Sequence, residues 1–276
     1  MERGPRERTM YARSDGETER SYQIPTQYVL NQYTVNNDPR ISQLYIQGKR
    51  VVGKDTLSQY VGSIPGESNP PNVVLPLIGS RFLGANSPGV IGGFFKGPAA
   101  ATPLMLLAEH LFSKSEAEAL SLFPSGDAKA DYLAGIKASF NYYYQPTSDG
   151  TAQYNAYIAA NTTNGLVDWD ATTTSTPVGT DLSTTLLATN ARRAVSKQEK
   201  IIYQKYLALN TVASTEAWDD YRRTAFPKLP AASQSSSTRV DKLPTRLLYP
   251  QSEINTNAVN IPSVTQYTKI FWDSVD

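Results

Sequence analysis

Apolar residues recur every three or four positions between residues 103 and 122, which predicts an amphipathic helix. Pro103 suits the first turn of this helix, where a backbone N–H has no partner to lose. Pro124 and Gly126 are expected to end it. The positions that form the predicted apolar face are Leu104, Leu107, Ala108, Leu111, Ser115, Ala119 and Leu122.

A second helix is predicted over residues 127–144, directly after the first. Small residues along it, such as Ala130, Ala134 and Ala138, permit close packing of two antiparallel helices. With Pro146 beyond its end, the pair resembles a tetratricopeptide helix pair. A solenoid of such pairs needs about three repeats, so one pair alone does not establish a repeat protein.

The same periodicity predicts a short helix over residues 151–160 and a longer one over 196–210. A further helix carries Trp218, and Ser214 or Thr215 is expected to cap it. These elements together predict a mainly α-helical fold.

Long irregular segments separate the predicted helices. Residues 53–103 are rich in Gly and Pro, which indicates ordered loop with a few short strands. Residues 161–195 are rich in Thr, Asn and Gly and are interpreted as a polar surface loop insertion. The final segment, residues 264–276, predicts a short strand or helix that docks Phe271 and Trp272.

Composition limits the classes of ligand and of chemical site that the protein can have. The chain has 276 residues and a net charge of +1, so no strong field attracts nucleic acid. It has no cysteine and one histidine, His110, which excludes disulfides and thiolate sites, and we expect neither a metal nor a cofactor. No apolar run reaches 18 residues, so no membrane-spanning helix is expected. Abundant Tyr with few charges suits a neutral ligand such as a sugar.

The segment Asp168-Trp169-Asp170 is the sharpest local candidate for ligand binding. If it is extended, both carboxylates point to one side and the indole to the other. The carboxylates could then bind sugar hydroxyls or a calcium ion, while Trp169 stacks on a sugar ring. The alternative is a solvated loop with Trp169 folded back onto the body of the protein.

A second candidate is a cluster of tyrosines at the end of the helix over 127–144. At least one of three consecutive tyrosines must face solvent on a helix, and core packing explains the others. The members of the cluster are Tyr142, Tyr143, Tyr144, Tyr154 and Tyr157.

Two sets of charged residues have a structural interpretation that we favour over a catalytic or anion-binding one. Glu109 and Glu116 share a helix face, but about 10 Å along the axis separates them, which is poor spacing for a glycosidase pair. Arg222 and Arg223 could bind an anion, but arginines more often pair with carboxylates such as Glu109, Glu116 or Glu253.

Several blocks follow one another in a fixed order, at residues 36–40, 60–62, 197–209, 216–223 and 246–257. In this order and spacing they resemble the SusD/RagB family, bacterial outer-membrane lipoproteins that capture nutrients for a TonB-dependent transporter. Signature positions that look like scaffold in this family are Glu109, Glu116, Trp218, Arg222, Arg223, Tyr249, Pro250 and Glu253.

The resemblance implies a tetratricopeptide-like helical scaffold, with residues 1–276 as the C-terminal part of one SusD-like domain. It implies a protein of the outer membrane at the cell surface, with a SusC-like TonB-dependent transporter as partner and an oligosaccharide, or a peptide, as ligand. Residues 1–10 have neither an apolar signal segment nor a lipidated cysteine, so we expect an anchor elsewhere. The protein is expected to bind and not to catalyse, and no nucleic-acid partner is expected.

Two rival functions remain open. One is an intracellular tetratricopeptide scaffold that binds protein tails, which predicts denser repeats and a charged groove. The other is a glycoside hydrolase that uses Asp168 or Asp170, which requires a second positioned carboxylate.

Overall fold

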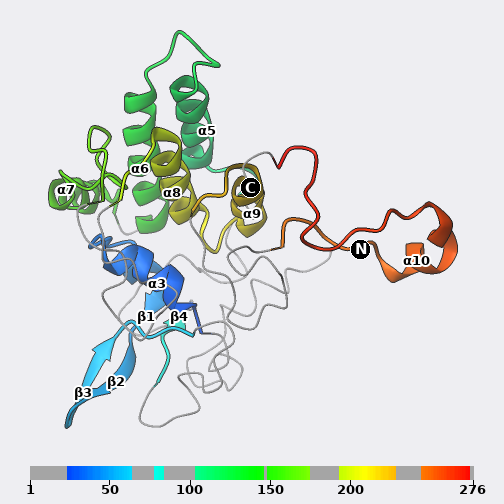
Figure 1. Ribbon diagram of the computed structural model, residues 1–276. Coiled ribbons are helices and arrows are strands. Elements are labelled where there is room, and N and C mark those ends of the chain that lie inside the picture. The colour runs from blue at the N-terminus through cyan, green and yellow to red at the C-terminus, as the bar shows by residue number, and fades with distance from the viewer. Residues whose placement is uncertain are drawn as a thin grey trace.

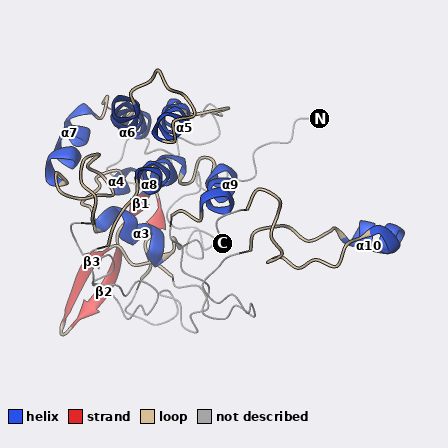
Figure 2. Ribbon diagram, turned by 45° about the horizontal axis from the view of Figure 1, so that its top comes forward, coloured by secondary structure: helices blue, strands red, loops and turns tan. Residues whose placement is uncertain are grey.

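The computed structural model is mainly helical, in agreement with the sequence periodicity (Figure 1). Most of its helices form one body, from which a β-hairpin and a C-terminal arm project (Figures 1 and 2). The residues that the structure describes are 24–63, 78–83, 103–145, 148–174, 193–227 and 244–273.

Three helices form the centre of the body: α5 (Leu107–Ala119), α6 (Ala128–Tyr144) and α8 (Lys197–Leu209), each in contact with the other two (Figure 1). The close approach of α5 and α6 depends on Gly135, because a Cβ there would lie 2.8 Å from the Phe112 ring. The prediction that small residues permit close packing of this pair is consistent with this contact.

The ends of the paired helices follow from local caps. Asp127 accepts a hydrogen bond from the Ala130 N–H at 3.0 Å, so α6 begins where it was predicted. The predicted start of α5 at Pro103 is wrong, because the helix begins at Leu107. There the Glu109 carboxylate accepts from the Leu106 N–H at 3.4 Å, which satisfies a free helix-end donor.

Smaller helices surround the centre: α3 (Gln27–Thr34), α4 (Ile41–Leu44), α7 (Thr151–Ala160) and α9 (Ser214–Thr224). The predicted cap of α9 is wrong. Ala213 occupies the cap position, and Ser214 and Thr215 lie within the helix without capping it.

The strands are short, as predicted. Strand β1 (Tyr45–Ile46) pairs with β4 (Arg81–Phe82) in an antiparallel arrangement, and the second pair of strands is antiparallel as well. Strands β2 (Gly48–Val52) and β3 (Asp55–Gln59) form the hairpin, whose turn includes Gly53 at a φ of 66°. The rest of the predicted loop over 53–103 falls largely on residues 64–77 and 84–102, outside the described residues.

The predicted polar loop over 161–195 is not confined to the surface. Asn164 and Val167 are each 1% exposed, and Leu166 belongs to the hydrophobic core. The segment enters the core because its amides find internal partners: Asn164 Nδ2 donates to Asn36 Oδ1 at 2.7 Å. Residues 175–192 lie outside the described part of the chain.

Residues 244–273 form an arm that carries α10 (Gln251–Asn257) and a 3-10 turn (Ala258–Asn260) away from the body (Figures 1 and 2). None of the α10 side chains is buried. The strand or helix predicted over 264–276 is wrong for residues 264–273, which form turns, and Phe271 is 95% exposed.

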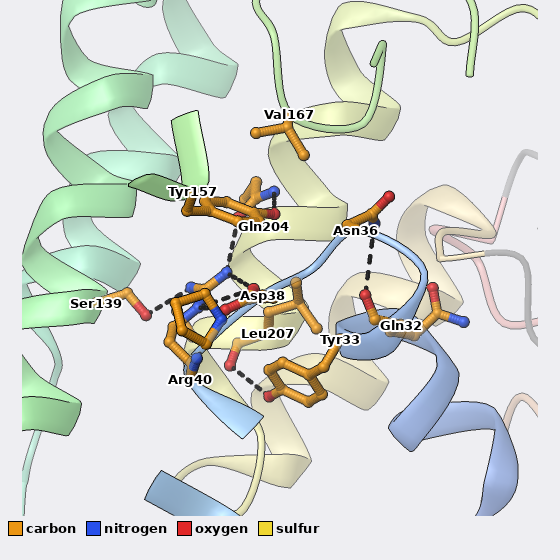
Figure 3. A network of polar contacts seen from close by, with 12 residues as sticks. Gln32, Tyr33, Asn36, Asp38, Arg40, Ser139, Tyr157, Val167, Gln204 and Leu207 are labelled. Atoms are coloured by element: carbon orange, nitrogen blue, oxygen red, sulfur yellow. Dashed lines mark hydrogen bonds and ion pairs between the residues drawn. The ribbon is translucent and has the colours of Figure 1, made fainter. Parts of the chain in front are cut away.

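A buried ion pair lies between the N-terminal helices and the central ones (Figure 3). Arg40 and Asp38 are 0% and 1% exposed, and Arg40 Nη2 lies 2.5 Å from Asp38 Oδ2. Arg40 also donates to Ser139 Oγ on α6 at 2.8 Å and to Gln204 Oε1 on α8 at 3.1 Å. Its guanidinium lies 4.7 Å from the centre of the Phe140 ring. One side chain thus joins three parts of the fold.

Glu116 plays a similar part at the other side of the body. Both its oxygens accept from Arg223 on α9 at 2.7 Å, and Oε1 also accepts from Gln198 on α8 at 2.9 Å. Arg223 donates to Asp220 as well, at 2.9 Å. Glu109 and Glu116 therefore have separate structural roles, because Glu109 caps the start of α5 and Glu116 joins α5 to α8 and α9.

The remaining signature residues hold the base of the arm or lie on it. Arg222 pairs with Asp219, and its guanidinium lies 4.0 Å from the Trp218 ring and 5.6 Å from the Trp272 ring. Trp218 Nε1 donates to the Pro244 carbonyl at 3.2 Å. On the arm itself, the Tyr249 ring lies 5.5 Å from the Arg246 guanidinium, Pro250 precedes α10, and Glu253 accepts from Asn257.

Replacing Arg40 by alanine should destabilise the protein by about 3–5 kcal/mol, because Asp38 is left buried without its cation. Urea denaturation followed by circular dichroism measures this loss. Lys137→Ala removes an exposed cation from α6 and should change the free energy of unfolding by less than about 0.5 kcal/mol. If Arg40→Ala does not fold, Ser139→Ala should still cost about 1–2 kcal/mol. Equal stability of the Arg40 and Lys137 variants would contradict the assignment.

The Glu116 contacts should make stability depend on acid. Burial acts to raise the pKa of Glu116, but hydrogen bonds from Arg223 and Gln198 outweigh it and hold the pKa below its usual range. A lowered folded-state pKa stabilises the protein above the unfolded pKa, and this contribution is lost as pH falls through the folded value. Stability measured from pH 6 to pH 3 should therefore fall less steeply in Glu116→Gln than in the original protein. Identical slopes would contradict this.

Candidate functional site

Residues 164–174 form a closed loop whose ends meet next to α8. The Gly165 N–H donates to the Thr173 carbonyl at 2.7 Å, and the Val195 N–H donates to Thr172 at 2.8 Å. A side chain at Gly165 would lie 2.8 Å from the Thr173 oxygen, so this closure requires glycine. The loop is anchored at its base and presents residues 168–171 to one side of α8.

The Asp168-Trp169-Asp170 segment is bent, so of the two arrangements considered from the sequence the structure has the loop folded back and not the extended one. The Asp170 N–H donates to Asp168 Oδ1 at 3.0 Å, a local turn that a strand does not allow. The Asp170 carboxylate pairs with Lys129 on α6 at 2.5 Å. The Lys129 hydrogen bond lowers the pKa of Asp170, which stays ionised at neutral pH.

The Trp169 ring is partly buried and packs on the body of the protein. Its centroid lies 5.3 Å from that of Tyr132 on α6, whose hydroxyl donates to the Val167 carbonyl at 2.9 Å. Lys197 Nζ lies 4.2 Å from the centre of the Trp169 ring. The indole is thus folded back, yet it keeps solvent-accessible surface among charged side chains.

Lys200 holds the loop from α8, a role that sequence reasoning did not detect. Its ammonium donates to three backbone carbonyls, those of Asp168 at 2.6 Å, Trp169 at 2.7 Å and Ala171 at 2.8 Å. The residue is 1% exposed, and burial lowers the pKa of its ammonium to about 8. No local pattern indicates this contact, since about thirty residues separate the lysine from the loop.

Three tyrosines of the predicted cluster are buried. Tyr143 donates to the Ala208 carbonyl at 3.1 Å, and Tyr144 donates to Pro39 at 3.0 Å. The Tyr157 hydroxyl accepts from Gln204 at 2.9 Å, above the Arg40 network (Figure 3). Their rings and hydroxyls are engaged in the core, where a ligand does not reach them.

Tyr142 and Tyr154 are partly exposed but lie on different surfaces. Tyr154, on α7, packs edge-on against Phe140. Tyr142 borders a groove of about 370 Å³ between α5 and α6. The other residues that line the groove are Leu106, Leu107, Ala108, Leu111, Ala134, Lys137, Ala138 and Asn141.

Within the described ranges, no three His, Asp or Glu side chains come together as a possible metal site. Among the same residues, no helix is both long enough and apolar enough to cross a membrane.

A protein-family model described as starch-binding and associating with the outer membrane, the SusD-like model, matches residues 3–250. No curated protein matches the chain significantly. Solved structures of SusD homologues do match. A chitin-binding homologue from Flavobacterium johnsoniae is 23% identical, with a TM-score of 0.58 over 91% of this chain and 49% of that one. A homologue from Bacteroides fragilis is 20% identical, with a TM-score of 0.56 over 91% and 50%.

A further homologue, from Bacteroides thetaiotaomicron, is 19% identical, with a TM-score of 0.58 over 85% of this chain and 45% of that one. At these identities the solved structures show the shared fold, and this chain spans about half the length of each relative. The family model covers most of the chain, including residues 36–40 and 216–223 that carry the resemblance. The chain therefore belongs to the SusD-like family.

Proposed function

We propose that this chain is part of a cell-surface nutrient-binding protein that captures an oligosaccharide and passes it to a TonB-dependent outer-membrane transporter. The observation that carries the proposal is the family match over residues 3–250, whose description names starch binding and the outer membrane. The chitin-binding relative supports a glycan over a peptide as ligand. A lipid anchor would hold the protein at the outer membrane, with a SusC-like transporter as its partner.

The exposed part of the Trp169 ring and the charged side chains around it form what we call the Trp169 surface. This surface is a better candidate for the glycan contact than the groove beside Tyr142. An indole offers a flat apolar surface for the C–H face of a sugar ring. Around it lie Asp168 and Asp170, which can accept hydrogen bonds from hydroxyls, and the ammonium groups of Lys129 and Lys197, which can donate them. A sugar on the face near Lys197 has to displace its ammonium, which also donates to the Trp169 carbonyl, and the side chain is long and exposed.

The groove beside Tyr142 suits a sugar less well. Leu and Ala side chains form most of its lining, with Lys137 and Asn141 as the polar groups. Sugar recognition needs many polar groups to replace the water around the hydroxyls, because unpaired buried hydroxyls are costly. The two surfaces can be separated by experiment, since Tyr142 and Trp169 belong to different ones.

The environments of the two carboxylates support binding over catalysis. A glycosidase requires a general acid with a raised pKa and a second carboxylate across a cleft. The Lys129 contact instead lowers the pKa of Asp170, and Asp168 is engaged by the Asp170 N–H within the same turn. Neither carboxylate has the environment of a catalytic acid.

Trp169→Ala should weaken retardation of the protein in native gels that contain soluble starch or glycol chitin. Loss of one aromatic platform should cost on the order of 1 kcal/mol, or about fivefold in affinity. The matched control is Tyr142→Ala, which truncates a partly exposed aromatic in the α5–α6 groove and should leave retardation unchanged. Loss of retardation in Tyr142→Ala alone would move the glycan site to the groove.

The purified protein should release no product from any polysaccharide that retards it, as judged by a reducing-end assay over a day. The expected absence of turnover follows from the ionised state of Asp170 at neutral pH. Reducing ends that appear with the original protein and disappear with Asp170→Asn would favour the glycoside hydrolase instead.

A further inference from the structure

The Trp169 surface carries an ammonium group on its solvent side. Lys197 Nζ lies 4.2 Å from the centre of the indole ring and also donates to the Trp169 carbonyl. Tyr132, which is 0% exposed, packs against the same ring from the core, so the open side of the indole is the one that the exposed Lys197 side chain approaches. A sugar that stacks there meets this ammonium before it meets the ring.

The charged side chains around the indole do not balance. Two are aspartates and three are lysines, which leaves a formal charge of +1: Asp168, Asp170, Lys129, Lys197 and Lys200. Lys129 and Asp170 pair with each other at 2.5 Å, and the buried Lys200 donates to three backbone carbonyls. Among the described residues, Lys197 has no carboxylate within ion-pair distance, so its ammonium is free to pair with a ligand.

Lys197 can leave the ring without disrupting the loop. The Trp169 carbonyl that it contacts also accepts from Lys200 at 2.7 Å, so this carbonyl keeps a partner when Lys197 turns away. The side chain is long and exposed, and its ammonium regains water outside the site. What it loses is the contact with the indole face, and a neutral sugar offers no charge to replace that contact.

An anionic sugar changes this balance. A carboxylate on the sugar ring gives the displaced ammonium a charge-assisted hydrogen bond, while the C–H face of the same sugar stacks on the indole. Both contacts can form together because the ammonium starts beside the ring. The low net charge of the whole chain does not argue against this, because the charge that a bound ligand meets is local.

We propose that Lys197 determines the ligand class of the Trp169 surface, which takes oligosaccharides with carboxylate groups, such as uronic-acid chains, in preference to neutral ones. This inference rests on the proposed function, because it requires the Trp169 surface to bind a glycan. It goes further by naming the charge of the glycan and the residue that recognises it.

The test compares ligands that differ only in charge. Oligogalacturonate and oligomannuronate are titrated into the protein by calorimetry, each beside its fully methyl-esterified form. At least one acid should bind about fivefold more tightly than its ester, the size expected for one partly exposed ion pair. The preference should shrink between about 20 mM and about 500 mM sodium chloride, because salt screens exposed charges. Equal affinity for acid and ester with both sugars would overturn the proposal.

Lys197→Ala should move the two affinities in opposite directions. The acid loses its ion pair and should bind about fivefold more weakly. The ester gains a free indole face and should bind about two- to fivefold more tightly, because no cation has to leave the ring. Lys197→Arg, which keeps the charge, should keep the preference for the acid. A change of the same sign for both ligands would show that Lys197 only supports the loop, and the proposal would fail.

Lys137→Gln is the matched control, because it removes an exposed cation from α6 in the groove beside Tyr142. It should leave both affinities unchanged. Loss of the preference for the acid in this variant, with the preference intact in Lys197→Ala, would assign the anionic sugar to the groove and overturn the proposal.

Failure of the proposed function gives a different result. In that case neither acid, ester, soluble starch nor glycol chitin binds the original protein, and both proposals are rejected together. Retardation by starch or glycol chitin that depends on Trp169, with equal affinity for acid and ester, would reject the role of Lys197 alone.

Discussion

The guanidinium of Arg40 is buried completely, and a buried cation must be matched by acceptors because its hydration is lost. Asp38 supplies the opposite charge from two residues away, while Ser139 and Gln204 supply the remaining acceptors from α6 and α8 (Figure 3). The relative placement of these helices is therefore constrained by the fixed fork of one side chain. The segment that carries the pair also contributes Asn36, which fixes the start of the 164–174 loop.

Tyrosines recur in the core, and several of their hydroxyls donate to backbone carbonyls. Tyr143 contacts the end of α8, Tyr144 contacts Pro39, and Tyr203 donates to the Gln32 carbonyl at 2.7 Å. A buried hydroxyl is tolerated only with a partner, so each ring gives both apolar packing and one directed contact. High tyrosine content is thus partly a property of the core, and it is weaker evidence for a sugar-binding surface than composition alone suggests.

The Trp169 surface combines order with adaptability. Tyr132 supports the ring from α6, and Lys200 holds the adjoining backbone from α8. Lys197 and Lys129 reach the same region from the solvent side, where their charges balance those of the loop carboxylates. A preorganised aromatic with movable charged neighbours is well suited to ligands that differ in their hydroxyl pattern, since rigid packing fixes the platform and long side chains adjust the hydrogen bonds.

The sequence by itself determined the mainly helical class and the limits of α6 and α7, because periodicity and caps such as Asp127 act over a few residues. It also indicated the family, through the order and spacing of several short blocks. It singled out Trp169 as an aromatic residue in a polar segment. Only the tertiary structure decided that Tyr143 and Tyr157 are core residues and that Lys200 holds the loop. The physical reason is that burial and charge matching are set by contacts between residues far apart in the chain, which local patterns do not encode.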